Sequence, residues 1–391
     1  MDVFLENVTP DSSFWSAYSR LWENSMDRSP FQAPHILKFF AGECKTVPIA
    51  FQYSRDGDLK AATLLVPKKK EYHFLSDLKT DHNFFVIHSD CCKEHIRLFF
   101  ESFLEKVKRE KWALLLNNQP GWAPYMDTFQ EALRSSNLFW EYIPYSVCPV
   151  IEGESPEDML AQMGRSKSTK YAVSRLKNQL NAEFEALTDD ESIDQWANQF
   201  CDAHIRRWAE TPTPSYFQNP DRIRFLKGCL HAWQKDGLLV RFSIRTGEQR
   251  IGFSISLRQG NRMVGHSLAF DPDFSKYSPG KALFYFKAEW MKDNNMNVFD
   301  FGDGNESYKY YSANMEHELC RIFISDPGNM RFILKAKVIK YVRKNARLFD
   351  FYRAKIKPVA PRLAKIKNLN FHFVWSSIAP SLTYLTNDLT L

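Results

Sequence analysis

The hydrophobic pattern of the first 150 residues predicts alternating strands and helices. Apolar runs rich in β-branched and aromatic residues are typical of strands, and they occupy residues 46–54, 61–67, 71–77, 112–118 and 145–151. Residues 94–110 instead repeat their apolar positions at helical spacing, and a second helix is expected over 126–138. This alternation indicates a mixed α/β layer structure.

A second unit begins at the sequence "ESPEDMLAQM". Here Ser155 is a candidate N-cap, Pro156 takes the first helical position and Asp158 completes a capping box. Three helices are expected next: a basic helix over 164–180, a long helix that ends near Trp208 and a further helix over 221–235. Period-two patterns then predict an antiparallel meander with strands at 238–246, 249–259 and 262–270, followed by a helix over 282–293 and a strand from residue 297.

Length and charge divide the chain further. Its 391 residues exceed one ordinary core, so we expect units at 1–150, 151–326 and 327–391. Residues 331–367 contain thirteen basic residues and one acid, a net charge of +12, so the rest of the chain carries −6. Apolar residues interleave with these charges. The pattern predicts a basic amphipathic helical tail that lies on an anionic membrane surface, docks on a partner or binds RNA phosphates.

Composition narrows the class of protein. The hydrophobic fraction of 44% and the aromatic fraction of 15% exclude disorder for most of the chain. The seven cysteines are scattered without a C-x-x-C pair, so we expect reduced thiols and neither a disulfide framework nor a metal site. The N-terminus is acidic and lacks the apolar run of a signal peptide, and no segment is apolar enough to span a bilayer. We therefore expect a cytoplasmic protein, peripheral to the inner membrane face if the tail binds lipid.

The loop "DPDFSKYSPGK" connects the third meander strand to the next helix. A glycine-containing turn that opens a helix presents free backbone N–H groups and the positive helix end to an anion. The candidate phosphate-binding residues are Ser278, Gly280, Lys281 and Ala282. Taken alone, such a turn is common in α/β proteins.

The order of elements and the run from Ala269 to Lys309 resemble a known family. Antiparallel strands, a phosphate-type turn, a helix and a further strand are similar in order to the core of the GNAT acyltransferase superfamily. The segments "DPDFSKYSPG" and "DFGDGNESYK" resemble the signature of CelD-like acetyltransferases, which are associated with cellulose and exopolysaccharide biosynthesis. Relatives carry arginine where this chain has Asp303. The resemblance implies a tandem GNAT fold, shared with Fem-type peptidoglycan transferases, with mixed, mainly antiparallel sheets flanked by helices.

The resemblance also implies roles for individual residues. Acyl-CoA would be the donor co-substrate, with its pyrophosphate on the turn and its carbonyl oxygen near the backbone N–H groups of Leu268 to Phe270. Asp303 or Glu306 would act as general base, or both are solvated turn residues. Tyr308 would protonate the departing thiolate and Lys309 would bind a phosphate or carboxylate, the alternatives being packing and surface charge. The candidate substrate-binding residues are Arg165, Lys167, Lys170 and His266. The alternative for the three basic residues is a solvent-exposed helix surface, and the alternative for His266 is a packed core histidine.

The function hypothesis is N-acyl transfer from acyl-CoA to a small-molecule or carbohydrate amine, such as an amino sugar of a cell-envelope polysaccharide. A second hypothesis replaces the donor by aminoacyl-tRNA, as in Fem-type enzymes, and makes tRNA the nucleic-acid partner. A third is a catalytically silent GNAT fold that serves as an assembly or membrane-binding subunit, motivated by Asp303 in place of arginine.

Overall fold

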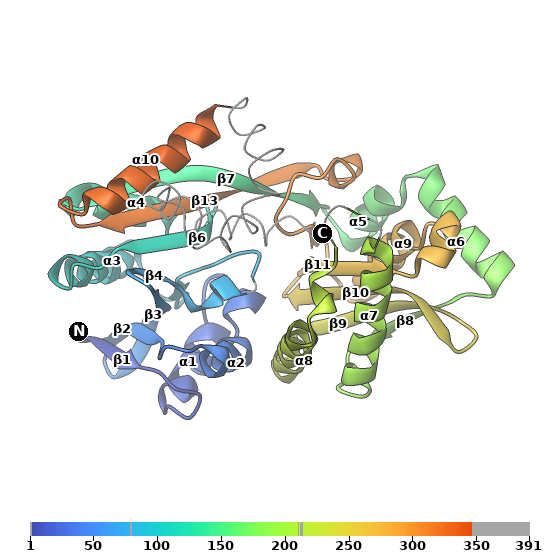
Figure 1. The fold of residues 1–391 in the computed structure, drawn as a ribbon, viewed down its shortest axis with the longest axis horizontal. Helices are drawn as coiled ribbons and strands as arrows, with labels where there is room; N and C mark the ends of the chain where they lie inside the picture. Colours follow the sequence, from blue (N-terminus) through green and yellow to red (C-terminus); the bar gives the residue numbers. More distant parts are fainter. Residues whose placement is uncertain (1, 79, 210, 212–213, 346–391) are drawn as a thin grey trace, which may run out of the picture.

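The computed structural model describes residues 2–78, 80–209, 211 and 214–345 (Figure 1). One mixed sheet of 13 strands runs through the whole described chain, with helices on both of its faces. The strands are β1 (Asp2–Asn7), β2 (Ile49–Arg55), β3 (Asp58–Lys68), β4 (Glu71–Phe74), β5 (Val86–Ile87), β6 (Leu114–Pro120), β7 (Phe139–Glu152), β8 (Glu183–Leu187), β9 (Leu239–Thr246), β10 (Gln249–Gln259), β11 (Arg262–Phe270), β12 (Val298–Asp300) and β13 (Met315–Ser325).

The helices separate into long α-helices and short 3-10 segments. The α-helices are α1 (Phe14–Glu23), α2 (Pro34–Glu43), α3 (Lys93–Arg109), α4 (Met126–Ser135), α5 (Pro156–Gly164), α6 (Lys167–Leu180), α7 (Ile193–Trp208), α8 (Pro220–Lys235), α9 (Pro279–Asp293) and α10 (Met330–Lys344). The 3-10 helices are η1 (Pro30–Gln32), η2 (Leu75–Leu78), η3 (Tyr216–Gln218), η4 (Pro272–Tyr277) and η5 (Lys309–Tyr311). The predicted α/β class, with a mixed and mainly antiparallel sheet flanked by helices, is confirmed.

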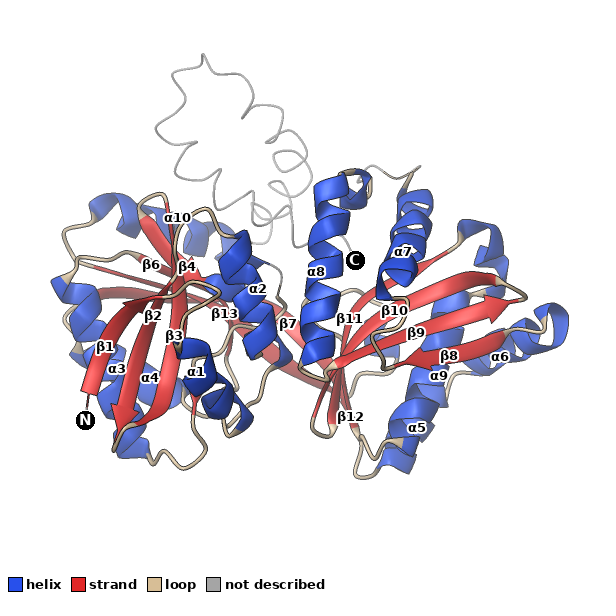
Figure 2. Cartoon of the chain, turned by 90° about the horizontal axis from the view of Figure 1, so that it is seen from below, coloured by secondary structure: helices blue, strands red, loops and turns tan. Residues whose placement is uncertain are grey.

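Two halves are joined by the long strands β7 and β13. The strand order is β1-β2-β3-β4-β6-β13-β7-β12-β11-β10-β9-β8, with β5 paired to β3. Figure 2 shows β7 and β13 crossing from one half to the other. Only β4–β6 and β11–β12 pair in parallel among the described strands. The expected separate sheets are thus one continuous sheet, because β12 pairs with β7.

The hydrophobic core is shared between the halves. Helices α1 and α2 of the first half and α7 and α8 of the second pack into one cluster over β3, β10 and β11. A second cluster lies under α3 and α4, and a third under α5, α6 and α9. Polar contacts also join the halves: the Trp233 indole N–H donates to the Pro30 carbonyl at 3.0 Å, and Arg224 makes two 2.9 Å bonds to Glu43. The relation between the halves is therefore built into the fold.

Most predicted elements occur where the pattern indicates them. The capping box at α5 forms as expected: the Ser155 hydroxyl accepts from the Asp158 N–H at 3.1 Å, and the Asp158 carboxylate accepts from the Glu154 N–H at 3.1 Å. Helix α7 ends at Trp208, and the turn between β10 and β11 has Gly260 at φ +58°. Helix α9 begins three residues before the expected start, at Pro279, because Pro at a first helical position fits its fixed φ.

Helix α10 forms the described part of the predicted basic tail. Its apolar side packs on β6, β7 and β13 of the first half, through Phe332 and Ala336. Lys335 is buried and forms an ion pair with Glu71 at 2.7 Å, so part of the tail's charge is used inside the fold. The remainder of the predicted tail, from residue 346, lies outside the described residues. Across the described ranges, none of the helices combines the length and apolarity needed to cross a membrane.

Candidate active site

Strands β11 and β12 run side by side for only three residues. Arg262, Met263 and Val264 pair with Val298, Phe299 and Asp300, and β11 then continues to Phe270 while the β12 chain turns away. The turn requires Gly302 at φ +68° and Gly304 at φ +117°, a backbone region that glycine adopts without a Cβ clash. Beyond Val264, the β12-facing edge of β11 has no strand partner among the described strands.

His266 is the extra residue of a bulge at this point. Ser267 pairs with Ile255 and Gly265 pairs with Ser256, so no β10 residue stands opposite His266. A bulge changes the side on which the following side chains project. His266 accordingly packs toward Phe31, whereas Leu268, two residues further along β11, packs on the α9 side.

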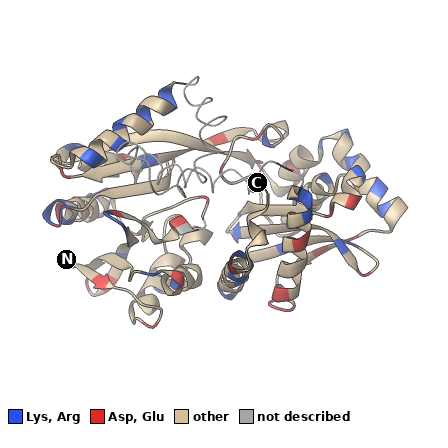
Figure 3. Cartoon of the chain, in the orientation of Figure 1, with Lys and Arg blue, Asp and Glu red and all other residues tan. Residues whose placement is uncertain are grey.

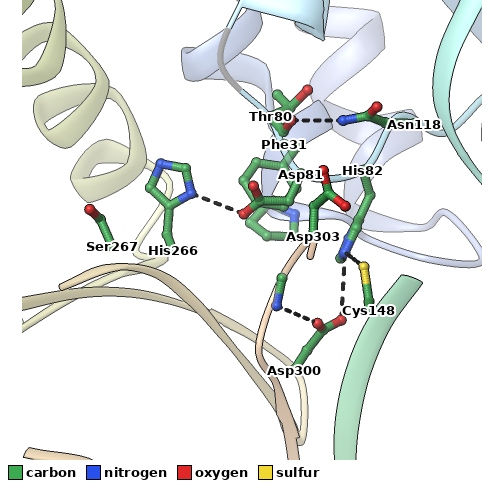
Figure 4. A network of polar contacts seen from close by, with 12 residues as sticks. Phe31, Thr80, Asp81, His82, Asn118, Cys148, His266, Ser267, Asp300 and Asp303 are labelled. Carbon is green, nitrogen blue, oxygen red and sulfur yellow. Dashed lines mark hydrogen bonds and ion pairs between the residues drawn. The ribbon is translucent and has the colours of Figure 1, made fainter. Parts of the chain in front are cut away.

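The His266 side chain meets an aspartate from the first half. Its Nδ1 lies 3.1 Å from the Asp81 carboxylate, and its ring is held edge-on against Trp233 at 5.1 Å and beside Phe31 at 5.8 Å (Figure 4). His266 is buried, with 6% of its surface exposed. Because the carboxylate accepts from Nδ1–H, the arrangement sets the tautomer in which Nε2 carries the lone pair. Asp81 therefore fixes the orientation of the His266 ring.

The predicted phosphate turn lies on the other side of β11. Ser278 takes a left-handed conformation, φ 55° and ψ 57°, and caps α9. A Cβ placed on Gly280 would be 3.7 Å from the Leu268 side chain, so the turn rests directly on β11 two residues from His266. Ala282 is fully buried and anchors the helix start in the core. Of the four predicted residues, Ser278 and Gly280 shape the turn and Lys281 supplies its charge.

The basic helix α6 lies beside this turn. The Lys281 ammonium donates to the Ser168 hydroxyl at 3.1 Å, and Arg175 donates to the Lys276 carbonyl at 2.8 Å while covering the Tyr277 ring. Lys167 and Lys170 are exposed at the same end of α6. Lys and Arg are concentrated on α6 in Figure 3. The first turns of α6 and α9 thus combine two helix N-termini with exposed lysines, a setting that favours an anion.

Arg165 takes a different position from these lysines. Its guanidinium donates to the Tyr311 carbonyl. This bond ties the start of α6 to the segment that follows the glycine-containing turn after Asp300, called the Asp300 turn below. This contact places the basic helix and the "YKYY" segment side by side. Arg165 therefore connects the two groups of residues that the sequence had marked separately.

The Asp300 turn holds its residues mainly by internal bonds. Lys309 is fully buried, donates to the carbonyls of Gly302, Asp303 and Gly304 at 3.4, 2.8 and 3.2 Å, and pairs with Glu306 at 2.9 Å. Such a lysine stabilises the turn and has no free N–H direction for a ligand. Glu306 is occupied by the same pair. The predicted roles of phosphate binder and base therefore fit neither side chain in this arrangement.

Asp303 and Tyr308 are the other two candidates from the segment after β12. The Asp303 carboxylate accepts from the Ser146 hydroxyl, and Figure 4 shows it on the same side as Asp81. Tyr308 is 55% exposed and its ring stands 6.4 Å from that of Phe301. Burial of part of the Tyr308 side chain raises its pKa, so its hydroxyl keeps its proton at neutral pH. The hydroxyl is thus able to donate a proton.

Asp81 was not among the residues that the sequence marked as candidates, and 185 residues separate it from His266. An acid next to a histidine in a loop after a strand is a weak signal in one sequence. Only the packing of the two halves brings the pair together.

Comparisons with known proteins agree with this geometry. Residues 164–310 match the model of the acetyltransferase (GNAT) domain. Among solved structures, FemX has a similar fold with TM-score 0.60 and 10% identity, covering 86% of this chain and all of FemX. L-PGS from Bacillus licheniformis gives TM-score 0.56 and 12% identity, covering 85% of this chain and 98% of that one.

A third structure is the C-terminal domain of a putative lysylphosphatidylglycerol synthetase from Agrobacterium fabrum. Its TM-score is 0.55 and its identity 10%, covering 83% of this chain and 95% of that one. No functionally curated protein matches the chain in sequence. The finer resemblance to the CelD-like branch stays a prediction. Residues 164–310 are therefore similar to an acetyltransferase (GNAT) domain, and this matched segment contains the turn from Ser278 to Lys281, His266 and the turn after Asp300.

Proposed function

We propose that this protein is an N-acyltransferase in which His266 is the general base, oriented by Asp81. The acceptor amine attacks the carbonyl carbon of a thioester, and its proton passes to His266 Nε2. The tetrahedral intermediate then collapses, the carbon–sulfur bond breaks, and the thiolate takes a proton from Tyr308. The 3.1 Å contact between Asp81 and His266, at the point where β11 and β12 part, is the observation that carries this proposal.

The donor is an acyl-CoA in this proposal. Its phosphates would sit at the N-terminus of α9, where Lys281 and the Gly280 backbone N–H are directed, with Lys167 and Lys170 of α6 nearby. The chain from this turn back along β11 leads toward His266, so the thioester carbonyl would lie against the free edge of β11. Backbone N–H groups between Leu268 and Phe270 are its candidate oxyanion donors.

The acceptor is a primary amine on the side of the first half. Asp81 and Asp303 place carboxylates beside His266, which favours a substrate that arrives as an ammonium ion. An amino sugar of a polysaccharide precursor satisfies this requirement and is the acceptor class implied by the CelD-like resemblance. Packing of the Phe31 and Trp233 rings around His266 keeps bulk water from the base.

A second donor is aminoacyl-tRNA, the donor associated with Fem-type enzymes. The exposed lysines of α6 beside the donor turn favour a large polyanion as well as a nucleotide. The two donors differ in size and in salt dependence. A tRNA that contacts many lysines loses affinity steeply as salt rises, whereas a CoA thioester held by a few N–H groups loses much less.

The test is calorimetric titration with acetyl-CoA of the wild-type protein, Gly280→Asp and Gly280→Ala. An added Cβ meets only ordinary contact with Leu268 at 3.7 Å, so both variants keep the fold, and an acid at a helix N-terminus does not destabilise it. We expect wild type and Gly280→Ala to bind, and Gly280→Asp to lose at least ten-fold in affinity. Equal binding by all three, or no binding by wild type, overturns acyl-CoA as the donor at this turn.

A further inference from the structure

Three buried side chains converge behind the proposed base. His82 Nε2 lies 3.4 Å from Cys148 Sγ and 3.6 Å from Asp300 Oδ2, and the three ligand-type atoms all lie within 4.8 Å of one another (Figure 4). The exposed fractions are 3% for His82 and 0% for Cys148 and Asp300. They come from the segment after η2, from β7 and from the end of β12. The proposed acyl transfer uses none of them.

Hydrogen bonding satisfies only part of this cluster. A neutral imidazole nitrogen carries either one proton or one lone pair, so Nε2 can serve Cys148 or Asp300 but not both. At 3.6 Å the contact to Asp300 is longer than a hydrogen bond. In a catalytic relay the thiol and the carboxylate would use opposite ring nitrogens. Here both face the same nitrogen, which is the arrangement of ligands around a shared cation.

The separations agree with tetrahedral zinc coordination. Metal–ligand bonds of about 2.3 Å to sulfur and about 2.0–2.1 Å to nitrogen and oxygen, at tetrahedral angles, place nitrogen and sulfur about 3.5 Å apart and nitrogen and oxygen about 3.3 Å apart. The measured values are 3.4 and 3.6 Å. Histidine, cysteine and aspartate are also the ligand types that zinc takes in proteins. The cluster therefore needs only a small shift to enclose a metal.

The surroundings supply an outer shell, and one further histidine lies on the strand that pairs with β7. Asp300 Oδ1 accepts from the Gly302 N–H at 2.8 Å and Oδ2 accepts from Arg262 at 3.2 Å, so the carboxylate orientation is fixed. His317 stands opposite Cys148 in the β13–β7 register, and its buried Nδ1 has no hydrogen-bond partner in the part of the chain that the structure describes. Its ring packs on Trp122 at 4.7 Å. The lone pair of an unpaired buried ring nitrogen is able to coordinate a cation.

We propose that His82, Cys148 and Asp300 bind a divalent transition-metal ion of the zinc class, with His317 as the fourth ligand. The ion joins a loop of the first half to β7 and β12 at the junction of the halves. His82 is adjacent to Asp81, so the metal holds the aspartate that orients His266. The scattered cysteines gave no sign of this site, because its ligands are distant in sequence and meet only in the folded chain. The metal site stands independently of the acyl-transfer proposal.

The test uses the full-length protein, purified with a reductant, freed of metal by a chelator and titrated with Co²⁺. Tetrahedral cobalt bound to a thiolate gives visible ligand-field bands and a near-ultraviolet sulfur-to-metal band. We expect equimolar Co²⁺ with both signals in wild type, displacement of the cobalt by Zn²⁺, and loss of the sulfur band in Cys148→Ser. Cys92→Ser is the matched control, because Cys92 is exposed and lies outside the cluster, and it should behave as wild type.

Three results overturn the proposal. A wild-type protein that binds no Co²⁺ with a sulfur band sinks it without reference to any variant. A band that survives in Cys148→Ser and disappears in Cys92→Ser assigns the metal to a surface thiol. Where circular dichroism shows that Cys148→Ser does not fold, His82→Gln replaces it. The sulfur band should persist in this variant, but its affinity for Co²⁺ should fall at least ten-fold. An unchanged Co²⁺ affinity contradicts the assignment.

Discussion

Lys287 is a buried cation in α9, the helix whose first turn forms the donor site. It is 4% exposed and has aromatic rings as neighbours, Phe299 at 5.5 Å and Phe242 at 5.9 Å, with no carboxylate paired to it in the described chain. Burial lowers the pKa of Lys287 from 10.5 to about 7. The charged form is thus disfavoured in the folded protein.

The sign of the pH effect follows from this depressed pKa. Between pH 7 and 10.5 the unfolded chain binds more protons at Lys287 than the folded chain, so stability rises with pH through this window. The contribution of Lys287 to stability is fully present above pH 10.5 and is lost as the pH falls toward 7. One pKa unit corresponds to about 1.4 kcal/mol, so the contribution changes by about 2 kcal/mol between pH 7 and pH 9.

The substitution Lys287→Met removes this titration while keeping a similar side-chain length. We expect Lys287→Met to have a higher free energy of unfolding than wild type at pH 7, and the difference to shrink by about 2 kcal/mol at pH 9. Urea unfolding of both proteins at the two pH values measures it. Lys292→Met is the control, since Lys292 is exposed on the same helix and should show a pH-independent difference. An equal Lys287→Met difference at both pH values refutes the reasoning.

Two further predictions concern the site. His266→Gln should lower kcat by a factor of roughly 10²–10⁴ with donor affinity unchanged, and Asp81→Asn should lower kcat by a smaller factor. Thiol release at saturating donor measures both. A change in KM without a change in kcat would contradict the base role. Lys309→Met should lower the free energy of unfolding by about 3 kcal/mol, because three carbonyls lose a buried donor. Lys281→Met should leave thermal unfolding unchanged and weaken donor binding. The reverse pattern would contradict both assignments.

The local elements were predictable from the sequence because local rules determine them. The α5 capping box, the Gly260 turn and the amphipathic α3 each depend on residues within a few positions of one another. The turn that opens α9 was also predictable from its own residues, Ser278 to Lys281, whereas its role in donor binding stays a proposal. In these cases the tertiary structure agrees with the local preference.

The base and the metal cluster could not be found in this way. Asp81, His82 and Cys148 meet His266 and Asp300 only because β7 and β13 join the two halves into one sheet. The bulge at His266 shifts the side-chain alternation, which no period-two pattern reveals. The family resemblance implied a ligand-binding role for Lys309, yet its ammonium lies inside the turn.

Amine-dependent release of thiol tests the central claim most directly. Wild type and His266→Gln are each incubated with acetyl-CoA and a panel of amines that includes amino sugars, and free thiol and product mass are followed together. The account predicts that wild type releases thiol only with an amine and adds an acetyl group to it, while His266→Gln binds the donor and releases almost none. Equal turnover by the two proteins, or donor binding by wild type without transfer to any amine, would contradict it.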